Sequence, residues 1–189
     1  MDKLIQFLSA YGELAPEDIS LIKREAIEIS APKGTRLASA TEFLQEIHFL
    51  KRGITRVFYF TDKGDEVTKY FIDEEHFSSD GHSFLHQLPL TSYVETVTDC
   101  DLIKISRNAF DLFTEQIAGW SEIYLKILSQ GLHDKINRIS PMMAETATER
   151  YEKFMKRFPH LLNQIPLNLL ASYLGITKSS LSRIRKNID

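Results

Sequence analysis

Seven polar side chains near the C-terminal end of the chain have the types and the spacing to bind a nucleic acid. Lysine and arginine can donate hydrogen bonds to guanine edges or to phosphates, and serine and threonine hydroxyls can contact either. On a helix, residues three and four apart share a face, so most of this set would point outward together. The residues are Thr177, Lys178, Ser179, Ser180, Ser182, Arg183 and Lys186.

The charge of the chain is distributed unevenly. Residues 151–189 contain seven lysines and arginines and two acidic residues, which gives this part a net charge of +5. Because the whole chain carries -3, residues 1–150 carry -8. An acidic body with a basic C-terminal part favours a polyanionic partner for that part only.

Residues 167–184 have the pattern of two helices joined by a sharp turn. Ala171 is small enough for the helices to approach each other, and Gly175 stands where the turn requires left-handed backbone. Thr177 can cap the second helix through its hydroxyl. This pattern predicts a helix-turn-helix, and the alternative is a small helical unit whose basic surface is only solvated. The apolar contacts between the two helices would come from Leu170, Leu174, Ile176, Leu181 and Ile184.

The first part of the chain alternates short strands with turns. This texture is typical of a β-sandwich or barrel. Ser106 is suited to cap the helix that follows the last strand. The segments with strand character are 27–29, a run that Gly53 breaks at 51–53, 55–60, 67–72, 93–97 and 102–105.

A long helix connects the two parts. A broad apolar stripe runs from Trp120 to Ile139, which allows the helix to pack against the β domain, to form a dimer interface, or to do both. Pro141 is expected to end this helix. Thr146, with Glu149 three residues later, forms a capping box that starts the next helix. A domain boundary is therefore expected near residues 140–146.

Several other chemistries are excluded or disfavoured. The single cysteine, Cys100, cannot form an internal disulfide or hold an iron–sulfur cluster or a structural zinc alone. The sequence has no glycine-rich phosphate loop, no nucleophile elbow and no zinc-protease motif, so we expect no catalytic site, no cofactor and no enzyme activity. His82 and His86 would need a helix through their segment to meet on one face. We expect them to be exposed loop histidines, with no metal site.

The chain has no segment that approaches the ~20 apolar residues of a membrane span. Its N-terminus also lacks the pattern of an export signal. We therefore expect a cytoplasmic protein without a membrane partner.

The order of these parts resembles the cyclic-AMP receptor protein and fumarate-nitrate regulator (Crp/Fnr) family of bacterial transcription factors. The resemblance rests on 32–35, 49–53 and the helix-turn-helix at 171–185. It implies an α+β fold, with a cyclic-nucleotide-binding-like β-barrel of jelly-roll type and its helical lead-in at 1–116. A long dimerisation helix at 117–141 and a C-terminal helix-turn-helix domain at 146–189, lacking most of the family's wing, would follow.

The resemblance also implies a function. The chain would be a homodimer that binds double-stranded DNA in a sequence-specific manner and regulates transcription. A small-molecule effector and RNA polymerase are the further candidate partners. The alternative is a ligand-binding or protein-interaction module that does not bind DNA.

The effector site departs from the family pattern. In the family, a Gly-Glu pair holds the ribose of a cyclic nucleotide and an arginine holds its phosphate. Here Asp80, Gly81, Thr91 and Ser92 are the candidate pocket residues, but Leu90 stands where the arginine is expected. A buried phosphate without a guanidinium would lose its strongest charge-assisted hydrogen bonds. We therefore expect either a sensor of another ligand, not of cyclic AMP, or a ligand-free structural domain.

Overall fold

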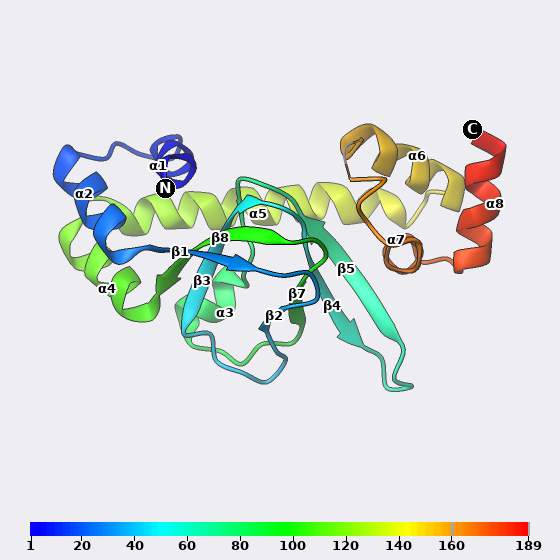
Figure 1. The fold of residues 1–189 in the computed structure, drawn as a ribbon, viewed down its shortest axis with the longest axis horizontal. Helices are drawn as coiled ribbons and strands as arrows, with labels where there is room; N and C mark the ends of the chain where they lie inside the picture. Colours follow the sequence, from blue (N-terminus) through cyan, green and yellow to red (C-terminus); the bar gives the residue numbers. More distant parts are fainter. Residues whose placement is uncertain (160, 189) are drawn as a thin grey trace.

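The computed structural model describes residues 1–159 and 161–188 (Figure 1). A β domain with helices at one end is connected to a group of C-terminal helices at the other end. The connection is one long helix, α5 (Trp120–Met142), which runs along the β domain and continues to the C-terminal helices. The N-terminal helices and the C-terminal helices therefore lie towards opposite ends of the molecule (Figure 1).

Two four-stranded antiparallel sheets form the β domain. One sheet has the order β1-β8-β3-β6 and the other has the order β2-β7-β4-β5, which leaves β5 at an edge. The six expected strand segments are all present, and the short strands β2 and β6 were not expected. The bounds are β1 Ile27–Ala31, β2 Arg36–Ala38, β3 Glu46–Arg52, β4 Thr55–Phe60, β5 Glu66–Ile72, β6 His76–Phe77, β7 Tyr93–Thr96 and β8 Cys100–Ser106.

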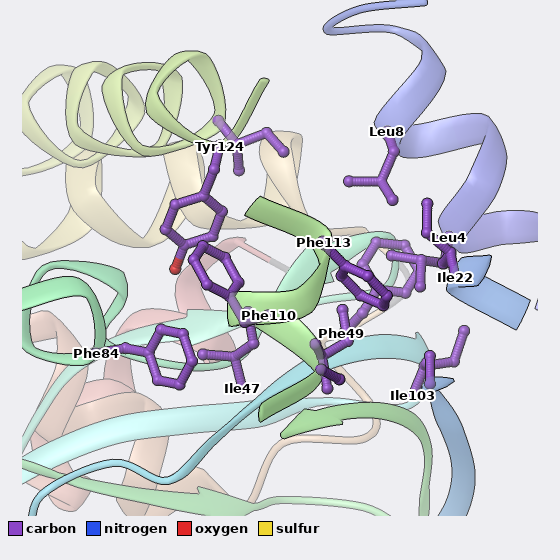
Figure 2. Close-up of a cluster of buried hydrophobic side chains, with 14 of the residues drawn as sticks. Leu4, Leu8, Ile22, Ile47, Phe49, Phe84, Ile103, Phe110, Phe113 and Tyr124 are labelled. Carbon is purple, nitrogen blue, oxygen red and sulfur yellow. The ribbon is translucent and has the colours of Figure 1, made fainter. Parts of the chain in front are cut away.

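The main core lies where helices cover the first sheet (Figure 2). Phe49 on β3 pairs with Ile103 on β8, and both side chains are fully buried. They pack with Leu4 and Ile22 of the first two helices and with Phe113 of α4. This apolar cluster fixes the helices to the sheet. The helices are α1 Asp2–Ser9, α2 Pro16–Glu25 and α4 Arg107–Gln116.

The expected helix caps are confirmed. The hydroxyl of Ser106 accepts a hydrogen bond from the Ala109 amide at 3.2 Å and starts α4. The capping box of Thr146 and Glu149 starts α6, Ala147–Arg157. Helix α5 ends at Met142, one residue beyond the expected stop at Pro141, which is within the usual uncertainty of a helix end.

The segment with His82 and His86 forms a short helix, α3 (Gly81–His86), so the expectation of loop histidines was wrong. Two local interactions produce the helix. The Asp80 carboxylate caps it by accepting a hydrogen bond from the Ser83 amide at 3.0 Å, and Phe84 is completely buried in the core.

Helices α6, α7 (Leu167–Leu174) and α8 (Lys178–Ile188) share a second core. Leu174 and Leu181 are fully buried between the last two helices. Phe71 of β5 belongs to the same core, so the C-terminal helices pack on the β domain as well as on one another. No helix in the described part of the chain combines the length and the apolar character that crossing a membrane requires.

Candidate nucleic-acid interface and effector groove

The turn between α7 and α8 depends on Gly175. Its φ of +69° lies in the left-handed region, and its amide donates to carbonyls at the end of α7. A side chain at this position would also meet Arg150, because a Cβ would lie 3.3 Å from the Nη1 atom of that residue. The glycine therefore sets the angle at which α8 leaves α7.

Thr177 directly precedes α8 and caps it. The hydroxyl of Thr177 accepts a hydrogen bond from the Ser180 amide at 3.1 Å. It also lies 3.0 Å from the Ser179 hydroxyl and 2.9 Å from the Ser180 hydroxyl. Three hydroxyls thus gather at the start of α8, where the unpaired amides of a helix favour an anion.

The rest of α8 divides into a buried and an exposed side. Leu181 is buried and anchors the helix, whereas Lys178, Arg183 and Lys186 are exposed. None of these three cations forms an ion pair with an acidic residue within 1–159 and 161–188. Six of the seven predicted side chains are on α8, with Thr177 as its cap, and Ser180 and Ser182 are only partly exposed. The exposed face can therefore offer charged donors to an outside partner.

One hydroxyl and one ring contact join helix α7 to the edge of the β domain. Ser172 Oγ accepts a hydrogen bond from the amide of Thr68 on β5 at 2.9 Å and donates one to the carbonyl of Glu66 at 3.1 Å. The ring of Tyr173 lies 5.5 Å from that of Phe71. Sequence reasoning did not identify this contact, since nothing local in the sequence relates residues about one hundred positions apart.

The four candidate effector residues are not brought together. Asp80 and Gly81 line a groove along α5, but Thr91 and Ser92 do not line it. Thr91 is exposed, and the Ser92 hydroxyl is 2.6 Å from Lys69 Nζ and accepts its hydrogen bond. The Asp80 carboxylate is already used as the cap of α3.

Leu90 is buried in the main core. An apolar side chain therefore fills the position at which the resemblance leads one to expect an arginine. This placement agrees with the argument from the sequence that a buried phosphate would lack a guanidinium partner there.

The groove itself has a volume of about 660 Å³ and lies between α5, α3 and β5. Leu128 and Leu132 of α5 are among the apolar residues that line it. At the end near the C-terminal helices, Arg138 donates a hydrogen bond to the Phe71 carbonyl at 3.2 Å. Burial lowers the pKa of the Arg138 guanidinium. Only the wide apolar stripe of the long helix could have indicated this groove in advance.

The fold belongs to the class seen in Crp/Fnr regulators. No family model and no curated protein matches the sequence. FixK2 from Bradyrhizobium japonicum aligns with a TM-score of 0.75 at 15% identity, over 86% of this chain and 84% of that chain. A putative Crp/Fnr-family transcriptional regulator from Eubacterium rectale gives 0.72 at 18% identity, over 92% and 83%.

The catabolite activator protein of Thermus thermophilus aligns as well, with a TM-score of 0.59 at 18% identity, over 96% of this chain and 86% of that chain. These alignments extend over nearly the whole chain. The resemblance to the Crp/Fnr family is therefore confirmed at the level of the fold.

Proposed function

We propose that this chain is a sequence-specific DNA-binding transcription regulator. The observation that carries the proposal is the exposed cationic face of α8, presented by a glycine turn and a buried leucine anchor on a Crp/Fnr-type fold. In this proposal Lys178 and Ser179, in the first turn of α8, reach base edges, because the first residues of a recognition helix are the ones that contact them. Arg183 and Lys186 then contact bases or phosphates further along the groove. We propose no catalytic role for this surface.

A homodimer would present two copies of α8. Leu125, Leu132 and Ile139 of α5 follow one another at seven-residue intervals, with Ile136 between the last two, and all four side chains are 47% to 59% exposed. This heptad spacing is the pattern of a two-stranded coiled coil. Pairing of two α5 helices would cover these side chains and allow two half-sites about 34 Å apart to be read together.

We also propose that the β domain and α5 form a sensor for a ligand other than cyclic AMP. The groove along α5 has the size of a small-molecule site, and buried Leu90 fills the position where the family pattern has its phosphate-binding arginine. RNA polymerase is the partner through which a DNA-bound regulator would act. A protein with this function would be located in the cytoplasm of a bacterium.

A selection from fragmented genomic DNA tests the proposal. We expect the immobilised chain to retain fragments that share a pseudo-palindromic sequence, and the variant Arg183→Ala to retain fewer of them. Arg24→Ala is the matched control, because Arg24 is an exposed arginine on α2, at the opposite end of the molecule (Figure 1). If the wild-type chain retains no fragment above background, the proposal is wrong and a protein-interaction module remains.

A further inference from the structure

Two exposed histidines on α3 lie next to each other, with their rings tilted. His82 and His86 are four residues apart on this helix, and their ring centroids are 4.6 Å apart with an interplanar angle of 55°. Both side chains are accessible from outside the molecule. The proposed DNA-binding surface on α8 does not include these two histidines.

The separation of the rings fits a shared metal ion. With metal–nitrogen bonds of about 2.1 Å, two imidazoles bound to one ion have centroids roughly 4.5 to 5.5 Å apart. Histidines at positions i and i+4 of a helix are the arrangement that zinc proteases use for two of their ligands. The observed ring separation is therefore compatible with binding of one ion by both imidazoles.

The helix that carries the pair is held from inside. The Phe84 ring is buried and lies 5.2 Å from that of Phe110, and the Arg107 guanidinium donates to the Phe84 carbonyl. Gly81 packs so closely on α5 that a Cβ there would lie 2.2 Å from Leu128 Cδ2. Because the backbone of α3 is fixed on both sides, ion binding would not require the helix to be ordered first.

We propose that His82 and His86 form a binding site for a divalent transition-metal ion that prefers imidazole ligands. Copper(II), nickel(II) and zinc belong to this class, with copper(II) bound most tightly. Within the described residues, no group of three or more histidine, cysteine or carboxylate side chains gathers into a metal site. Water molecules would therefore occupy the remaining coordination positions, and the bound ion could dissociate into the surrounding solution.

The position of the site suggests what the ion affects. His82 lines the groove along α5, next to Gly81. An ion bound by the pair places a positive charge at the edge of this groove. The site is independent of α8, so its presence does not depend on DNA binding.

Calorimetric titration of the tag-free full chain with copper(II), nickel(II) and zinc tests the site. We expect one ion per chain, no binding of magnesium, and a loss in copper affinity on the order of tenfold or more in His82→Gln and in His86→Gln. His133→Gln is the matched control, since His133 is an exposed histidine on α5 whose ring contacts Asn137 rather than a second histidine.

A second readout excludes an effect of misfolding. Zinc in excess should raise the melting temperature of the wild-type chain and of His133→Gln by mass action, but not that of the two α3 variants. Equal copper affinity in His82→Gln and His133→Gln would overturn the proposal, as would an absence of binding to the wild-type chain. Retention of genomic DNA, measured separately, reports on the proposed regulator function alone.

Discussion

The contact between Ser172 and the edge of β5 gives a prediction with a calculable size. Replacing Ser172 by alanine removes the hydroxyl that pairs with the Thr68 amide and the Glu66 carbonyl. Thr68 is only 3% exposed, so its amide loses a partner that water replaces poorly. An orphaned buried group costs about 2 kcal/mol, and the better helix propensity of alanine returns about 0.5 kcal/mol. The expected net loss is about 1.5 kcal/mol.

Two measurements check this value. Urea unfolding followed by the fluorescence of Trp120, the only tryptophan, should show the loss in the free energy of unfolding. Hydrogen exchange at the Thr68 amide should become about tenfold faster, because local separation of α7 from β5 exposes it.

The control is Ser121→Ala, since Ser121 is exposed on α5 and its hydroxyl has no hydrogen-bond partner in 1–159 and 161–188. Equal unfolding free energies for the two alanine variants, together with unchanged exchange at Thr68, would refute the reasoning.

The α5 interface, the Leu90 position and the buried His48 each give a further prediction. Leu132→Glu places charges in the proposed α5 interface and should convert a dimer to a monomer in sedimentation. Glu122→Gln, on the same helix, should leave the dimer intact. A dimeric Leu132→Glu variant would exclude the interface. Calorimetric titration with cyclic AMP should show no micromolar binding, because Leu90 fills the arginine position, and micromolar binding would contradict this. Burial lowers the pKa of His48 despite the nearby Glu46 carboxylate. The unfolded chain then binds more protons, so stability should fall as the pH drops below about 6.5, with a slope of at most about 1.4 kcal/mol per pH unit. This slope should diminish in His48→Gln, and identical slopes would show that another group titrates.

Local features of the fold could be predicted from the sequence, because the interactions that make them span only a few residues. The caps at Ser106 and Thr146 and the turn at Gly175 each depend on hydrogen bonds or backbone angles within one helical turn. The strands could be predicted because short runs of β-branched and aromatic residues lie between turn residues, although β3 and β4 are buried on both faces and do not alternate.

Features that depend on distant partners could not be predicted. Helix α3 forms because Phe84 reaches a core completed by Phe110 of α4, and no local periodicity reveals that core. The candidate effector residues follow the order of the family pattern, but the Ser92 hydroxyl pairs with Lys69 on β5, a contact that the order of residues does not reveal. The hydroxyl of Ser172 is likewise informative only once β5 is known to be an edge strand.

The most direct test of the central claim is binding of a selected DNA fragment, measured by fluorescence anisotropy between 50 and 200 mM salt. Affinity should fall steeply with salt, as expected when lysines and arginines release counterions from phosphates. Arg183→Ala should weaken binding by about 1 to 3 kcal/mol if the arginine contacts a base, or lower the salt slope by about 1 if it contacts a phosphate. Arg24→Ala should change neither quantity. If Arg183→Ala binds with the wild-type affinity and the wild-type salt slope, α8 does not read DNA and the account is contradicted.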